Sequence, residues 1–162
     1  MKSIISCSLI ILFSILAGVI PHTAEAAEWE LVFEDRFQRD NVGENYITVH
    51  GKTSIVAGRL LLQGGGATAL IEQAFAPDVK LEFDAQAHPD QPPCDLSVAY
   101  SAHPVHGYRY LLAFGGKSNQ ANQLIGPGVR QVDDNPPFVI EPGKKYHMVA
   151  VREGKNISYT VN

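Results

Sequence analysis

The sequence predicts an all-β protein made of antiparallel strands, because apolar and polar residues alternate in short runs that turn residues separate. The clearest run is Val79–Gln86, in which Val, Leu, Phe and Ala alternate with Lys, Glu, Asp and Gln. About ten such runs, roughly 8–12 residues apart, are typical of a β-sandwich or barrel. The predicted strands span residues 29–33, 53–57, 59–63, 67–75, 79–86, 95–99, 108–114, 123–125, 129–132, 145–152 and 157–161.

Turn chemistry marks the boundaries of these strands. Ala57-Gly58 and residues 153–156 predict hairpin turns. The three glycines at 64–66 predict a flexible break, and residues 115–119 a polar turn. Prolines in the segments 88–93 and 135–137 predict rigid loops, and residues 126–128 predict a tight turn. The chain shows no internal repeat or linker, so residues 27–162 are predicted to form one domain.

The first 26 residues have the pattern of a cleavable signal peptide. A charged start at Lys2 precedes an apolar run over residues 4–20, and Ala24 and Ala26 supply the small residues of a cleavage site before Ala27. An uncleaved membrane anchor is the alternative, since a run of about 17 residues lies at the lower limit of a membrane span. The sequence therefore predicts a secreted or periplasmic protein that meets the membrane only through its signal peptide.

Composition narrows the class of partner. The chain carries a formal net charge of −4 and lacks a basic stripe, which argues against nucleic-acid binding. Cys94 is the one cysteine after the predicted cleavage site, so it has no internal disulfide partner. It is expected to be a small buried apolar side chain, with a reactive thiol as the alternative.

The last residues predict an unfinished sheet. Residues 157–162 form an alternating strand that ends without a turn or a partner, which would leave an unpaired edge. We therefore expect the domain to be incomplete at its C-terminus, within a hairpin.

Two segments resemble the laminin-G-like, or concanavalin A-like, lectin/glucanase superfamily. Residues 31–37 (LVFEDRF) resemble the FEDxF opening of exported bacterial members, and residues 141–162 resemble a hairpin in which Tyr146 replaces a tryptophan. Residues 79–114 resemble exported domains related to the 3-keto-disaccharide hydrolases. The resemblance implies an antiparallel jelly-roll sandwich and a carbohydrate partner.

The residues that catalysis would need are incomplete in this sequence. A glucanase of the superfamily carries Glu-x-Asp-x-x-Glu on one strand, where two carboxyl groups act as acid/base and nucleophile. Glu82 and Asp84 supply the first two positions, but Ala87 takes the third, so both acids are expected on the solvent face of their strand. A hydrolase of the 3-keto-disaccharide type stays as an alternative, with Glu72, Asp84, Asp95 and His103 as candidate acids or bases.

Aromatic and planar polar residues between positions 95 and 130 predict a sugar site. A pyranose has an apolar face and a ring of hydroxyl groups, which flat aromatic and hydrogen-bonding side chains complement. Tyr108 and Tyr110 share a strand face with Leu112 and Phe114, so at least one tyrosine is expected in the core, while Arg109 lies on the opposite face. The predicted carbohydrate-binding residues are Tyr100, His103, Tyr108, Arg109, Tyr110, Asn119, Asn122 and Arg130.

The sequence predicts no cofactor. His103 and His106 could offer nitrogens to a metal, but no cluster has the spacing of a structural zinc site. Loop oxygens for a calcium ion are available, with nothing to select among Asp90, Asp95, Asp133 and Asp134. The predicted function is an exported carbohydrate-binding or recognition module without its own catalysis. The alternatives are the hydrolase and a cell-surface structural or interaction domain.

Overall fold

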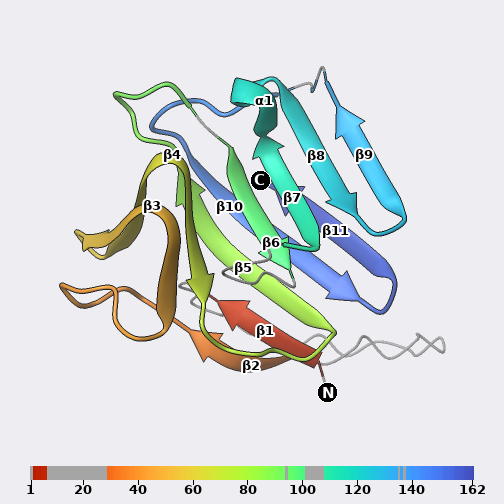
Figure 1. The fold of residues 1–162 in the computed structure, drawn as a ribbon, viewed down its shortest axis with the longest axis horizontal. Coiled ribbons are helices and arrows are strands. Elements are labelled where there is room, and N and C mark those ends of the chain that lie inside the picture. Colours follow the sequence, from red (N-terminus) through yellow and green to blue (C-terminus); the bar gives the residue numbers. More distant parts are fainter. Residues whose placement is uncertain (1, 7–28, 94, 101–107, 135, 137) are drawn as a thin grey trace, which may run out of the picture.

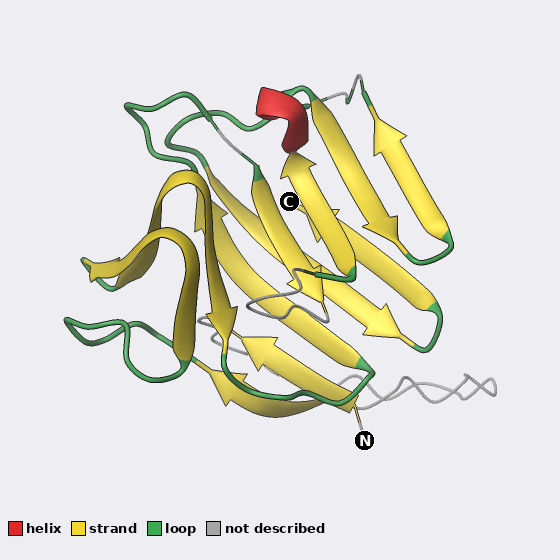
Figure 2. Cartoon of the chain, in the orientation of Figure 1, coloured by secondary structure: helices red, strands yellow, loops and turns green. Residues whose placement is uncertain are grey.

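The computed structural model describes residues 2–6, 29–93, 95–100, 108–134, 136 and 138–162 (Figure 1). Within these ranges the regular structure is almost all β-strand, with one four-residue helix (Figure 2). The elements are β1 (Lys2–Ser6), β2 (Trp29–Glu34), β3 (Tyr46–Val56), β4 (Arg59–Ile71), β5 (Val79–Gln86), β6 (Leu96–Tyr100), β7 (Tyr110–Gly115), α1 (Gly116–Asn119), β8 (Ala121–Gly126), β9 (Val129–Asp133), β10 (Lys145–Glu153) and β11 (Asn156–Val161).

Two sheets pack face to face, which confirms the predicted all-β fold (Figure 1). One sheet has the strand order β11-β10-β5-β1-β2 and the other has the order β6-β7-β8-β9. Their inner faces share a core in which Val79 and Ala150 of the first sheet meet Val98 and Leu112 of the second. The β3–β4 hairpin forms a third, two-stranded sheet at the left of the view. A finer jelly-roll connectivity stays a prediction.

The alternation read from the sequence sets the two faces of each central strand. In β10, Tyr146, Met148 and Ala150 are buried, whereas the residues between them are partly exposed. Their partners across the β5–β10 pairing are Ala85, Phe83 and Leu81, which pack against the same core. Burying side chains of this kind stabilises the fold by about 1.5–3 kcal/mol for each large apolar residue.

The prediction of a flexible break at the three glycines 64–66 is wrong. These glycines lie within β4. Lys52 pairs with Gln63 and His50 pairs with Thr68, so residues 64–67 bulge out opposite the single residue Gly51. A Cβ on Gly51 would lie 2.5 Å from the carbonyl oxygen of Gln63, which explains a glycine at this close approach. The glycines therefore accommodate the bulge while strand pairing continues on both sides.

Strand β1 was not predicted, because it lies inside the predicted signal peptide. Residues Lys2–Ser6 occupy the position between β2 and β5 and run parallel to both. Among the described strands these are the two parallel pairings. Ile4 and Ile5 are β-branched, and such residues suit a strand as well as an apolar export segment.

Candidate functional site

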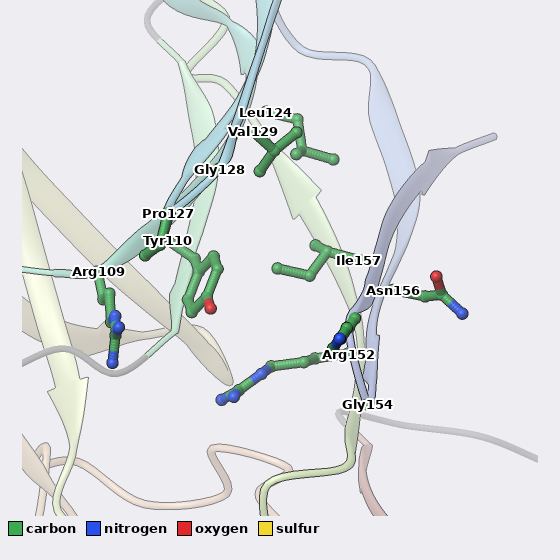
Figure 3. A pocket seen from close by; sticks show the side chains of 11 residues that line it. Arg109, Tyr110, Leu124, Pro127, Gly128, Val129, Arg152, Gly154, Asn156 and Ile157 are labelled. Atoms are coloured by element: carbon green, nitrogen blue, oxygen red, sulfur yellow. The ribbon is translucent and has the colours of Figure 1, made fainter.

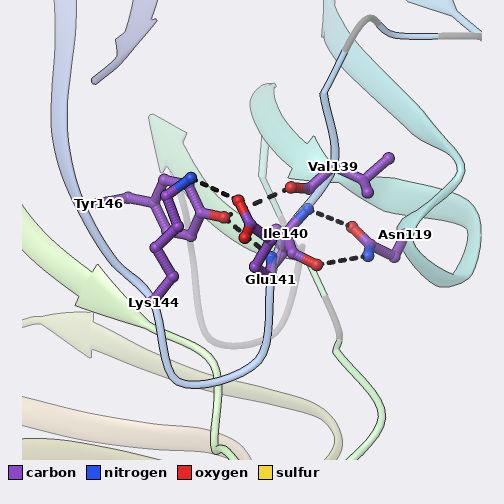
Figure 4. Close-up of polar contacts among 6 residues, drawn as sticks. All are labelled: Asn119, Val139, Ile140, Glu141, Lys144 and Tyr146. Carbon is purple, nitrogen blue, oxygen red and sulfur yellow. Dashed lines mark hydrogen bonds and ion pairs between the residues drawn. The ribbon is translucent and has the colours of Figure 1, made fainter.

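The two ends of the sandwich differ in how they are closed. At one end the segment 138–146 crosses the mouth between the sheets and is pinned by side chains (Figure 4). The hydroxyl of Tyr146 accepts a hydrogen bond from the amide of Glu141 at 2.8 Å and donates one to the carbonyl of Val139 at 3.4 Å. Tyr146 also packs edge-on against Phe114, with ring centroids 5.2 Å apart. We call this the closed end.

Asn119 holds the same segment from the opposite side. Its amide nitrogen donates to the carbonyl of Ile140, and its amide oxygen accepts from the Ile140 amide, both at 2.8 Å. The predicted polar turn at 115–119 makes this possible, because Lys117, Ser118 and Asn119 all have left-handed backbone angles, with φ of 54°, 60° and 66°. Asn119 thus serves the fold by closing one end of the core.

The other end of the sandwich is open and forms a cleft with a volume of about 640 Å³. In Figure 3, Tyr110 and Ile157 face each other across this cleft, and the Arg152 side chain extends beneath them. We call it the basic cleft. Its lining residues are Arg109, Tyr110, Leu124, Pro127, Gly128, Val129, Arg152, Gly154, Lys155, Asn156 and Ile157.

Arg152 enters the basic cleft because it continues the inner face of β10. It follows Tyr146, Met148 and Ala150 at intervals of two, and it pairs with Val79, whose side chain is in the core. A cation therefore occupies the last inward position of the strand, where the core meets solvent. Its guanidinium carbon lies 5.2 Å from the ring centroid of Tyr110, within the range of a cation–π interaction.

Gly126 gives Tyr110 its place in the cleft wall. A Cβ on Gly126 would lie 2.2 Å from Cδ1 of Tyr110, a separation that atoms cannot reach without displacement. Arg109 precedes β7 at a bend of the chain, so it lines the cleft together with Tyr110 although the two would alternate in a regular strand. The sequence predicted that Arg109 and Tyr110 lie on opposite faces of a strand, but the bend at Arg109 lets both side chains line the cleft.

Lys155 reaches the cleft from the predicted hairpin turn between β10 and β11. Glu153 pairs with Asn156, so Gly154 and Lys155 form the two-residue turn, and Gly154 has a φ of 56°. The Gly154 amide donates to Oδ1 of Asp78 at 2.6 Å, which ties the turn to the segment before β5.

All the charged side chains among the described lining residues are basic. Within the described chain, no carboxylate forms an ion pair with Arg109, Arg152 or Lys155. The buried hydroxyl of Tyr100 likewise has no hydrogen-bond partner among these residues. Burial raises the pKa of Tyr100, and the positive charge of Arg152 partly offsets that rise.

The structure distributes the sequence-predicted sugar residues over several places. Arg109 and Tyr110 line the basic cleft. Tyr100 lies in the core, and Tyr108 is 53% exposed. Asn119 holds Ile140, and the side chain of Asn122 accepts a hydrogen bond from the Gly115 amide. Arg130 is exposed on β9, and His103 lies outside the described residues.

Sequence reasoning missed Arg152 and Lys155 as cleft residues. A signal for Arg152 was present, because it extends the alternation of Tyr146, Met148 and Ala150 by one inward step. Lys155 carried a weaker signal, since a hairpin turn can point its side chains in several directions.

The acids considered for catalysis lie away from the basic cleft lining. Glu82 and Asp84 are on the outer face of β5, as expected, with the core residues Leu81 and Phe83 facing inward. Between these acids lies His147, with Nε2 3.3 Å from Glu82 Oε1 and Nδ1 3.0 Å from Asp84 Oδ1. Burial raises the pKa of Asp84, but hydrogen bonds from Lys145 and His147 outweigh it, so that pKa is lowered overall.

The other acids proposed for the hydrolase alternative have local roles or open surroundings. Asp95 accepts a hydrogen bond from the Ser97 hydroxyl at 2.7 Å, and Glu72 is exposed just after β4. Across the described ranges, no group of three or more His, Cys, Asp or Glu side chains is arranged to hold a metal ion.

Comparisons with known proteins give no family for the chain. No family model, curated protein or solved structure matches it. None of the helical residues in the described part of the chain forms a segment with the length and apolar character of a membrane span.

Proposed function

We propose that this protein is a carbohydrate-binding module whose ligand enters the basic cleft. The observation that carries the proposal is the open end itself: a cleft of about 640 Å³ that combines an aromatic ring, aliphatic side chains and guanidinium groups. Small-molecule sites commonly have volumes of about 300–1,000 Å³ and combine apolar walls with a few convergent polar groups.

The chemistry of the lining suits a sugar ring. Leu124, Val129 and Ile157 supply apolar surface against which the C–H face of a pyranose can pack. Arg109 and Arg152 supply planar forks of N–H donors, which can each hold a pair of neighbouring hydroxyl groups. The cation–π contact with Tyr110 orients the Arg152 fork before a ligand arrives, which lowers the entropic cost of binding.

The charges of the cleft favour binding over hydrolysis. Glycoside hydrolysis generally uses two carboxyl groups on either side of the scissile bond. The charged residues of the described lining are cations, which donate hydrogen bonds but do not act as the acid and nucleophile of that reaction. This function is consistent with the resemblance to concanavalin A-like domains and with the predicted export signal. We propose that the protein is also exported.

The experiment is a glycan array followed by NMR titration with a glycan that binds. We expect binding above background, with the amide resonances of Gly126, Gly128, Val129 and Gly154 shifting as ligand is added. The amide of Gly143 at the closed end is the internal control and should not shift. Absence of binding to every glycan would overturn the proposed function, and shifts confined to the closed end would overturn the proposed location.

A further inference from the structure

We infer that the saccharide bound in the basic cleft is acidic, carrying a carboxylate or a sulfate group that Arg109, Arg152 and Lys155 receive together. This inference rests on the proposed function and adds the chemical class of the ligand. The group that would accept the hydrogen bonds is a planar or tetrahedral oxyanion, for which arginine forks are the preferred protein partner.

Like charges converge on the basic cleft. The three cations come from separate parts of the chain: the bend before β7, the inner end of β10 and the β10–β11 turn. They gather at one cleft although the whole chain carries a net charge of −4. Like charges that share a cleft repel each other, and an anion in the cleft would relieve that repulsion.

The cations that line the basic cleft supply many N–H donors. In the described part of the protein, no hydrogen bond is donated by the side chains of Arg109, Arg152 or Lys155. An arginine side chain has five N–H donors and a lysine has three, so the cleft is rich in donors. A neutral sugar hydroxyl can accept some of these bonds, but an oxyanion accepts more of them and forms stronger ones.

Arg152 lies at the end of the core, at the last inward position of β10. Apolar residues occupy the preceding inward positions of β10, and Ile157 lies opposite Arg152 on β11. The aliphatic part of the cleft wall keeps water partly away from the guanidinium, which strengthens its attraction for an anion.

A paired glycan experiment tests the ligand class. The full chain is presented with an oligogalacturonate and its methyl ester, in which a methyl group replaces the negative charge of each carboxylate, and with a sulfated galactan and its desulfated form. We expect one or both acidic members to bind. We expect the affinity for each neutral counterpart to be lower by about tenfold or more. Binding to the uronate alone identifies a carboxylate as the recognised group, and binding to the sulfated galactan alone identifies a sulfate.

The outcomes separate this inference from the proposed function. Equal binding to acidic and neutral members would overturn the acidic class and leave the carbohydrate-binding function standing. If no saccharide of the pairs or of the wider array binds, the proposed function fails, and this inference fails with it. Binding to the acidic members that does not weaken as sodium chloride is added would also contradict the charge-based argument.

Single substitutions test the residues. Arg109→Gln, Arg152→Gln and Lys155→Gln should each weaken binding of the acidic saccharide by about tenfold, because each removes a charge-assisted contact. The matched controls are Arg36→Gln and Lys52→Gln, which make the same changes on exposed side chains outside the cleft. Arg109 and Lys155 lie outside regular strands, so their variants test the proposal even if Arg152→Gln disturbs the sheet. Unchanged affinity in both Arg109→Gln and Lys155→Gln would overturn the assignment.

Discussion

Replacing Asp35 by Asn should lower the free energy of unfolding, because it removes the negative charge of the ion pair with Arg39. Asp35 is the buried charged residue of the described chain, with 6% of its surface exposed. Its two carboxylate oxygens accept hydrogen bonds from both terminal nitrogens of Arg39, each at 2.7 Å, and Oδ1 also accepts from the Phe37 amide at 2.8 Å. These bonds fold the residues after β2 into a turn in which Phe37 has a φ of 54°.

The magnitude follows from what the substitution leaves behind. Removing one partner of a buried ion pair costs about 3–5 kcal/mol when the other charge is left without water. The Arg39 side chain is 29% exposed, so water can solvate part of its charge, and an Asn side chain can still accept from Phe37. We therefore expect Asp35→Asn to lower the free energy of unfolding by about 2–3 kcal/mol.

The assay is urea unfolding followed by the fluorescence of Trp29, which is the single tryptophan of the chain. Asp40→Asn is the control, because it makes the same change nearby on an exposed residue. A stability loss in Asp35→Asn no larger than in Asp40→Asn would refute the reasoning.

The pH dependence gives a second test of the same pair. Hydrogen bonds from Arg39, helped by those from Phe37 and Tyr46, outweigh burial and lower the pKa of Asp35 below its ordinary value of 3.8. A lowered pKa in the folded state contributes stability above the ordinary pKa, and this stability is lost as the pH falls through the folded pKa. The difference between the wild-type protein and Asp35→Asn should therefore be largest near neutral pH and shrink on acidification. A difference independent of pH would contradict the ion-pair explanation.

Three further substitutions test other parts of the fold by thermal unfolding. Tyr146→Phe removes the hydroxyl that holds Val139 and Glu141 and should cost about 1–2 kcal/mol, whereas Tyr108→Phe on an exposed ring should cost under about 0.5 kcal/mol; equal losses would contradict the role of the closed end. Gly126→Ala should displace Tyr110 and cost about 1–3 kcal/mol, while Gly65→Ala, which has open space around it, should have little effect; a tolerated Gly126→Ala would show that Tyr110 is not held as described. Asp84→Asn should lower the free energy of unfolding by about 0.5–1 kcal/mol at neutral pH. Because the pKa of Asp84 is lowered in the folded protein, this loss should vanish as the pH falls. A loss that persists in acid would rule out the ionic contacts as its cause.

The regular strands could be predicted because their pattern is local. The alternation in Val79–Gln86 identifies both the strand and its inner face, and the structure has the same bounds and the same face in the core. The hairpin turn at Gly154 was equally predictable, since a positive φ there suits glycine. The bulge at residues 64–67 was not, because three glycines fit a flexible break and a strand irregularity equally well.

The candidate site was harder to predict because it depends on long-range partners. Asn119 has the composition of a sugar contact, but its side chain is used by the backbone of Ile140, which lies 21 residues away. Arg152 looks like the polar end of a strand, and only the packing of two sheets makes it part of a cleft. Residue type therefore singled out Arg109 and Tyr110, which line the cleft, while Lys155 joins them only through the three-dimensional arrangement.

Strand β1 lies within the predicted signal peptide and would be lost if that peptide is removed. Its residues lie in the middle of a sheet, with β5 on one side and β2 on the other. If the chain is cut before Ala27, as the sequence predicts, the cut removes an interior strand and leaves two unpaired edges about 10 Å apart, twice the usual strand spacing. Either β2 then moves across to pair with β5, or another strand takes the vacant position. The sheet of the cut chain would therefore differ from that of the uncut chain at this point, because β2 and β5 would no longer have β1 between them.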